Sequence, residues 1–225
     1  AYSATIDTLA WVILLILFEL ETAVIPDEKL KGGLRFSLSA LSAVCYFFIV
    51  WSFYGYGVKF DMISAIQPFQ VSDVCSLAGG EWNVLATLNE YPPLDLVNCI
   101  AMQGQPVFQV IGTDILTTAE NHALAWRLAA VDIINSGTWL IVVVSLGIEV
   151  LLQLRQKLTG VMMKAATGIK GFLYLVLFAC AAYWGYDGSF LEFWDAFLWL
   201  VAFIFIELNI FQWHEEAEEV LPQGC

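Results

Sequence analysis

Residues 133–154 have the sequence IINSGTWLIVVVSLGIEVLLQL, in which Glu149 is the one charged residue. Residues 36–58 hold no charge, and residues 196–213 hold one, Glu207. A helix of about 20 apolar residues is long enough to cross the hydrocarbon core of a bilayer. A helix that is apolar on all sides lies either in a membrane or at the centre of a large fold, and 225 residues cannot build several such centres. These stretches therefore predict membrane spans.

The composition of the whole chain supports the same class. The chain is 60% hydrophobic and only 14% charged, whereas a soluble domain has about 25% charged residues. Its apolar runs do not alternate with polar residues as the strands of a membrane β-barrel do: residues 11–18 are WVILLILF, and residues 197–206 are FLWLVAFIFI. The first run lacks the basic start and the cleavage motif of a signal peptide, so we expect a span there. The predicted fold class is an all-α integral membrane protein.

The basic residues orient the predicted spans. Five spans are expected, at residues 5–25, 36–57, 133–154, 171–187 and 191–212. Seven of the nine basic residues lie in the connections 26–35 and 155–170, which fall on the same side of the membrane. By the positive-inside rule that side is the cytoplasm, which places the N-terminus outside and the C-terminus inside. We expect a multi-pass protein of the bacterial inner (plasma) membrane, with the lipid bilayer as its first partner.

The long segment between the second and third spans is a separate part of the predicted architecture. The chain divides into a first transmembrane hairpin (1–57), an extracytoplasmic cap (58–131), a second hairpin (132–187), and a fifth helix with an acidic tail (188–225). Several prolines and glycines in the cap predict irregular structure. Thr117 or Thr118, followed by Glu120, predicts the start of a helix that continues into the third span.

The cysteines divide between the cap and the spans. Cys75 and Cys99 both fall in the cap. In an oxidising compartment such a pair predicts a disulfide, and two buried thiols are the alternative. Cys45 and Cys180 lie in the middle of spans, where we expect reduced thiols.

The odd-numbered spans share a pattern that predicts an internal repeat. The pattern is an Asp or Asn four residues before a Trp: Asp7 and Trp11, Asn135 and Trp139, Asp195 and Trp199. A glutamate follows each Trp by eight or ten residues. Asp and Asn cap helix N-termini, and Trp is enriched at the membrane–water interface, so the pattern predicts capped helices with a Trp belt. Parallel repeats of hairpins occur in transporters and channels.

The same spans carry carboxylates near their cytoplasmic ends. With the amides at nearby depth, the predicted site comprises Glu19, Glu21, Glu149, Glu207, Gln153 and Asn209. No Lys or Arg falls within the predicted spans, so these carboxylates have no expected basic partner inside the membrane. An ionisable group in a span costs a few kcal/mol and usually faces a cavity, a partner or a transport path. The carboxyls can be protonated, bind a cation, pair with another chain, or simply snorkel to the interface.

Other functional classes find little support in the sequence. His214 with Glu215 and Glu218 is a weak candidate metal site, because no H-x-x-x-H or C-x-x-C pattern accompanies it. The sequence has no nucleophile motif and no phosphate-binding glycine loop, so we expect neither an enzyme nor a cofactor, a cation apart. The net charge of −13, without a concentrated basic patch, argues against nucleic-acid binding.

Two functional hypotheses follow. The leading one is a small cation- or proton-conducting membrane protein, a channel or transporter, which acts as a homo-oligomer with the glutamate layer along its path. The alternative is a non-catalytic accessory or structural subunit of a larger membrane complex, whose carboxylates meet Lys or Arg residues of other membrane subunits.

Overall fold

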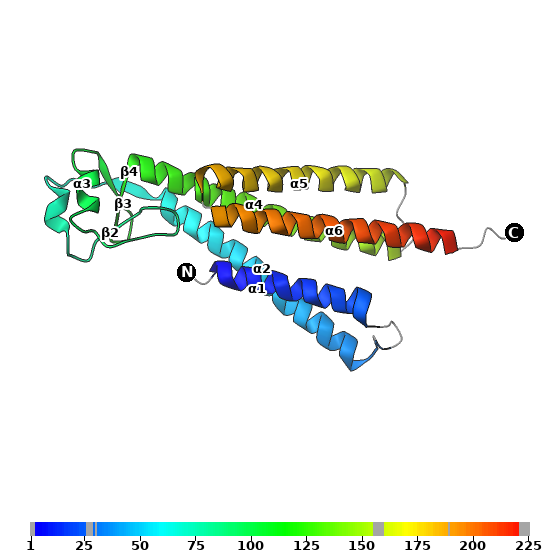
Figure 1. Cartoon of the computed structure of the whole chain (residues 1–225). Coiled ribbons are helices and arrows are strands. Elements are labelled where there is room, and N and C mark those ends of the chain that lie inside the picture. The colour runs from blue at the N-terminus through cyan, green and yellow to red at the C-terminus, as the bar shows by residue number, and fades with distance from the viewer. Residues whose placement is uncertain (1–2, 26–28, 30, 155–159, 189, 221–225) are drawn as a thin grey trace. The chain divides into compact units, whose positions relative to one another are not determined.

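The computed structural model is mostly helical and contains one small sheet (Figure 1). It describes residues 3–25, 29, 31–154, 160–188 and 190–220, and for residues 3–4, 22–23, 150–151, 153–154, 160–161, 163 and 206–220 it describes the backbone alone. The helices are α1 (Ser3–Glu19), α2 (Gly33–Ser64), α3 (Asn98–Met102), α4 (Ala119–Leu154), α5 (Gly160–Asp187) and α6 (Phe190–Val220), with a π-helical turn η1 (Leu20–Val24) and a 3-10 helix η2 (Val74–Leu77). The strands are β1 (Ile66–Pro68), β2 (Asn83–Val84), β3 (Val107–Val110) and β4 (Ile115–Thr118).

Three helices among the described residues are long and apolar enough to cross a membrane. They are α2, residues Ala119–Glu149 of α4, and residues Lys164–Asp187 of α5. All five predicted spans fall on helical segments. The start of α4 is also as predicted, because Thr118 Oγ1 accepts a hydrogen bond from the Asn121 amide at 3.3 Å and so caps the helix.

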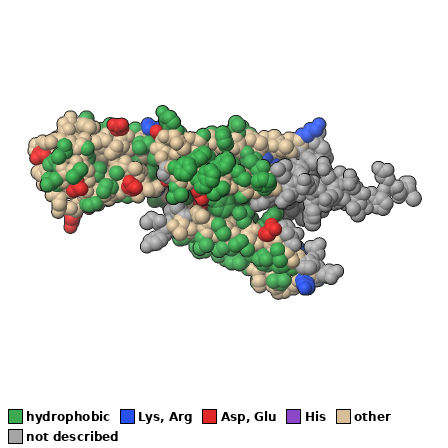
Figure 2. All heavy atoms as spheres, viewed as in Figure 1, with side chains coloured by type: hydrophobic (Ala, Val, Ile, Leu, Met, Phe, Trp, Pro, Cys, Tyr) green, Lys and Arg blue, Asp and Glu red, His purple; other side chains and the backbone are tan. Residues whose placement is uncertain are grey.

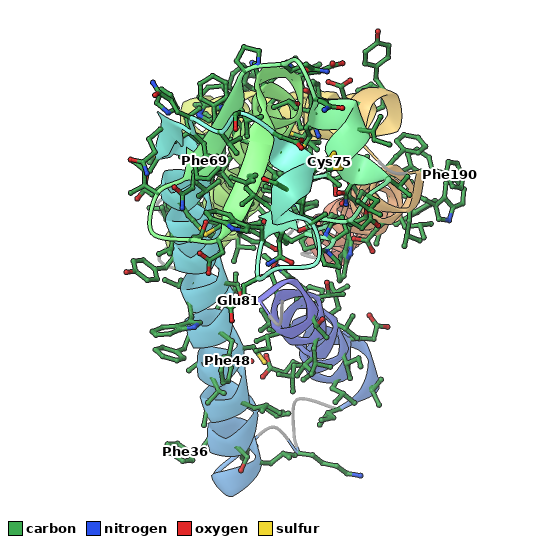
Figure 3. The ribbon with its side chains drawn as sticks, turned by 90° about the vertical axis from the view of Figure 1, so that its left-hand side faces the viewer. Phe36, Phe48, Phe69, Cys75, Glu81 and Phe190 are labelled. Atoms are coloured by element: carbon green, nitrogen blue, oxygen red, sulfur yellow. A yellow bond between two sulfur atoms is a disulfide. The ribbon has the colours of Figure 1, made fainter. Side chains whose placement is uncertain are left out.

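The chain divides into two compact units, Ala1–Ile133 and Ile134–Cys225. In the first unit α1 packs along α2, and in the second α5 packs along α6. The outer faces of these helices are apolar, as the green side chains of Figure 2 show. On α2, for example, Phe36 is exposed and points away from α1 (Figure 3). Large exposed apolar surfaces of this kind suit contact with lipid.

A four-stranded sheet lies within the cap, in the order β1–β3–β4–β2. β3 pairs antiparallel with both β1 and β4, and β2 pairs parallel with β4. The turn from β3 to β4 has Gly112 at φ 78°, a left-handed conformation that favours glycine. The all-α prediction is therefore wrong in the cap. The strands have only two to four residues, too few to show the alternation by which a sequence reveals a strand.

The cap has its own apolar core, closed by a disulfide. The buried core residues are Val74, Val84, Leu94, Cys99, Met102, Val107 and Leu116. Cys75 and Cys99 are disulfide-bonded, with their Cα atoms 5.1 Å apart, which confirms the predicted bridge (Figure 3). Cys45 and Cys180 are free and buried, as predicted for thiols within the spans.

The cap is joined to its helices where α2 ends and α4 begins. His122 Nε2 on α4 hydrogen-bonds the Ile63 carbonyl oxygen at 2.9 Å. One turn further along α4, Trp126 Nε1 donates to Ser64 Oγ at 3.1 Å. These bonds hold the two helix ends together, so the cap emerges from α2 and returns to α4 at one place.

Candidate functional site

Glu149 and Lys170 form a buried ion pair between α4 and α5. Lys170 Nζ lies 2.8 Å from Glu149 Oε2, and the two side chains are 4% and 17% exposed, respectively. The expectation that Glu149 lacks a basic partner is therefore wrong. Helix α5 begins at Gly160, well before the predicted span start at residue 171, so Lys170 lies inside the helix and not in a loop.

The pair changes what Glu149 can do chemically. A carboxylate bound to an ammonium group at hydrogen-bond distance is already neutralised by its partner. Removing one member of a buried pair costs about 3–5 kcal/mol, because the other charge is left without compensation. Glu149 thus joins α4 to α5 through this ion pair.

The other members of the predicted carboxylate site are not brought together with this pair. Glu19 ends α1 and is exposed, and Glu21 lies in the π-helical turn η1; both belong to the first unit. The side chains of Glu207, Gln153 and Asn209 lie outside the described residues, where only the helical backbone is placed. The glutamate layer stays a prediction.

Asp7 and Asp195 occupy positions that the sequence pattern assigned to helix caps, and that assignment is wrong. Asp7 lies inside α1, which begins at Ser3, and Asp195 lies inside α6. Each carboxylate instead accepts a side-chain hydrogen bond from the Trp four residues later, Trp11 or Trp199. Residues four apart share one face of a helix, and the indole N–H is a donor only. The same spacing that suggested a repeat therefore also makes a local bond.

Asp7 has a second contact and one unsatisfied atom. Tyr56 of α2 donates to Asp7 Oδ2 over a long 3.5 Å, which links the two helices of the hairpin. Asp7 Oδ1 is buried and has no hydrogen-bond partner among the described residues. A buried oxygen without a partner is costly, so this carboxyl is a polar group that the fold does not fully satisfy.

Asn135 and Trp139 follow the same spacing but have a different environment. Both lie in the middle of α4, so Asn135 is no helix cap. Trp139 is 9% exposed and its ring packs on Phe203 of α6 at 4.6 Å between centroids. Trp139 therefore packs within the second unit. The Trp belt stays a prediction.

The cap offers a groove as a further candidate site. It has a volume of about 570 Å³ and is lined by residues 68–72 and 103–107, together with Val74. Gln70, Gln103 and Gln105 place amide groups along it. No group of three or more metal-binding side chains occurs among the described residues. The side chains of the weak metal candidates His214, Glu215 and Glu218 lie outside the description.

The fold and these contacts define a class, a helical protein with membrane-spanning candidates and a disulfide-closed cap of mixed helix and strand. No protein-family model matches the chain, and no curated protein or solved structure matches it.

Proposed function

We propose that the chain is a non-catalytic accessory subunit of a larger membrane complex, anchored by its helices and presenting its cap outside the cytoplasm. The observation that carries the proposal is the Glu149–Lys170 pair. Glu149, one of the glutamates of the predicted ion path, is neutralised inside the chain by a lysine of the neighbouring helix. A subunit whose helices only anchor an extracytoplasmic domain needs charged side chains within the membrane to be paired, as Glu149 and Lys170 are.

The proposal includes five spans with the N-terminus outside, in a bacterial inner membrane. Lys29 and Lys31 lie between η1 and α2. The end of α1 and the start of α2 lie at the end of the first unit that is opposite to the cap (Figure 1). This separation of basic loop and cap supports a cytoplasmic loop. The Cys75–Cys99 bridge supports an oxidising compartment for the cap.

Single-cysteine labelling tests this topology. In a background without the free cysteines, Glu90→Cys in the cap should react with a membrane-impermeant thiol reagent in intact right-side-out cells. Gly160→Cys, at the start of α5, should react only after the membrane is opened. The reverse pattern would show that the orientation is inverted.

The accessory role is tested by gentle extraction and native mass spectrometry of the chain from cells that make it naturally. We expect foreign subunits at a fixed stoichiometry, and loss of the chain's stability when they are stripped away. A stable homo-oligomer that passes cations into liposomes would instead contradict the proposal.

A cation- or proton-conducting homo-oligomer is the second candidate. The observation in its favour is Asp7, whose Oδ1 is buried without a hydrogen-bond partner among the described residues. Such an oxygen is suited to take a proton or to contact a cation. Flux measurements in liposomes with the wild-type chain and with Asp7→Asn distinguish this candidate from the accessory role.

A further inference from the structure

Three aliphatic side chains project from the α3 region of the cap. Leu96, Val97 and Ile100 are 69%, 80% and 66% exposed. Val97 is the N-cap residue of α3 and has helical backbone angles, so Ile100, three residues later, shares its face, and Leu96 lies in the turn just before. The opposite face is used by the cap core, where Cys99 and Met102 are buried. Apolar side chains thus point both into the cap core and away from it, and those that point away are not covered by the chain itself. We call Leu96, Val97 and Ile100 the α3 face.

The α3 face is held in a fixed conformation. Asp95 Oδ1 accepts hydrogen bonds from the Val97 and Asn98 amides at 2.8 Å each, and Asn98 Oδ1 accepts one from the Asp95 amide at 2.9 Å. These reciprocal bonds fix the turn of residues 95–98 that leads into α3. The Cys75–Cys99 disulfide ties the same turn to η2. Apolar anchors held this way lose little conformational freedom on binding, as suits a preformed docking site.

The position of α3 limits what can cover it. Within the first unit, α3 lies at the end of the cap that is farthest from α1 and α2 (Figure 1). If α1 and α2 lie in the bilayer, the hydrocarbon of that bilayer does not reach the α3 face. Its aliphatic side chains therefore stand in water unless another molecule covers them, and clustered exposed apolar groups in water mark an interaction site.

The net charge of the cap indicates which kind of molecule covers the α3 face. The segment 58–131 has the acids Asp61, Asp73, Glu81, Glu90, Asp95, Asp114 and Glu120, against the bases Lys59 and Arg127. Acidic side chains stand at several points of its surface (Figure 2). A second acidic cap and an anionic membrane surface are both repelled by this excess. A protein with basic side chains around an apolar pocket is attracted.

We propose that the α3 face docks a cationic extracytoplasmic protein, with Leu96, Val97 and Ile100 entering an apolar pocket and the acidic cap meeting basic side chains around it. This inference rests on the accessory role and names the chemistry of the partner. The aliphatic contacts set how long the complex lasts, and the charges set how fast it forms, so that salt slows association.

Site-specific photocrosslinking in cells that make the protein naturally tests the proposal. A benzophenone amino acid replaces Val97 in the full chain, and the same probe at Gln70, in the groove, is the matched control. We expect a discrete adduct from position 97, several times stronger than from position 70, that mass spectrometry identifies as a protein with a basic surface. An adduct with a second copy, an adduct with lipid alone, or equal yields at both positions overturns the α3 face as the docking site.

The identified protein is then purified and titrated against the full chain in nanodiscs. Val97→Asp should weaken binding by about tenfold or more, and Val97→Ile should leave it unchanged. Binding should also weaken as salt is raised. Binding unaffected by Val97→Asp overturns the proposal. If position 97 gives no adduct while foreign subunits still co-purify with the chain, the docking inference fails and the accessory role stands.

Discussion

The cap and the second unit satisfy their polar groups in different ways. In the cap, a disulfide and side chain-to-backbone bonds, such as that from the Cys75 amide to Asp73 Oδ1 at 2.9 Å, fix the turns. In the second unit, Lys170 Nζ donates to Glu149 Oε2 at 2.8 Å, and Tyr183 Oη donates to Asp187 Oδ2 at 2.6 Å. Thr138 Oγ1 instead donates to the Ile134 carbonyl oxygen of its own helix at 2.6 Å. Most backbone groups of a helix bond internally, so a charged side chain there depends mainly on another side chain for its partner. Removing a single polar side chain should therefore cost more in the helices than in the cap.

The largest expected effect is that of separating Glu149 from Lys170. Glu149→Gln removes the carboxylate that bonds the buried ammonium group of Lys170 at 2.8 Å, and should lower the free energy of unfolding by up to about 3–5 kcal/mol. Lys170→Met should cost less, because Glu149 is the more exposed member of the pair. Thermal unfolding of the detergent-solubilised chain measures both.

The double variant Glu149→Gln with Lys170→Met sharpens this prediction. Replacing both charges removes the uncompensated group, so most of the lost stability should return. Lys164→Gln, at an exposed position of α5, is the matched control and should be silent. Single variants as stable as the wild type would show that the pair does not hold the helices.

The next largest effect is that of opening the cap disulfide. Cys75→Ser with Cys99→Ser should destabilise the cap by about 3 kcal/mol in the chain-entropy model. Amide hydrogen exchange in β3 and β4 of the full chain should then speed up by roughly two orders of magnitude, with exchange in α5 unchanged. Equal acceleration in the cap and in α5 would mean that the two regions unfold together and that the disulfide does not stabilise the cap alone.

The sequence predicted those parts of the fold that depend on long patterns. Apolar runs revealed the helices, and cysteine positions in a Pro-rich segment revealed the bridge. The sheet was missed because its strands are as short as β2, residues Asn83–Val84, and are assembled from segments far apart in the chain. Pairings of such short strands follow from tertiary packing and leave no periodic signal.

The candidate site was predicted less well, for a related reason. Lys170 was placed in a loop because basic residues usually lie outside membrane spans. In the structure it lies in α5 and forms an ion pair with Glu149 of the preceding helix. The bonds of Asp7 and Asp195 were missed although their signal was present, since an Asp four residues before a Trp faces it on a helix. The α3 face was missed because no pattern in the sequence predicted a short helix near residues 96–100.

A smaller effect is expected for the turn of residues 95–98 that leads into α3. Asp95→Ala removes the acceptor of two backbone amides and should destabilise this turn by about 1 kcal/mol. Exchange of the Val97 and Asn98 amides should rise by about fivefold to tenfold, and binding through the α3 face should weaken with it. Glu81→Ala, an exposed acid elsewhere on the cap, is the control for the lost charge. No change at these amides would show that the disulfide alone fixes the turn.

The smallest effect is expected for Asp7→Asn, and the larger loss expected for Asp7→Leu serves as its contrast. Asp7→Asn keeps an oxygen for the Trp11 indole and removes the charge of a partly buried group, so stability should change by less than about 1 kcal/mol. Asp7→Leu removes the acceptor altogether and should cost about 1–3 kcal/mol, because the indole N–H of the half-buried Trp11 loses this partner. The readout is the melting temperature of each variant in detergent, measured in sodium chloride, in potassium chloride and in the chloride of an organic cation.

If Asp7 only accepts hydrogen bonds, the three salts should have equal effects on the wild type and on Asp7→Asn. If the wild type is stabilised by one inorganic cation and Asp7→Asn is not, the carboxylate binds that cation. The first hairpin would then hold a cation site, and conduction would become the better account of this protein.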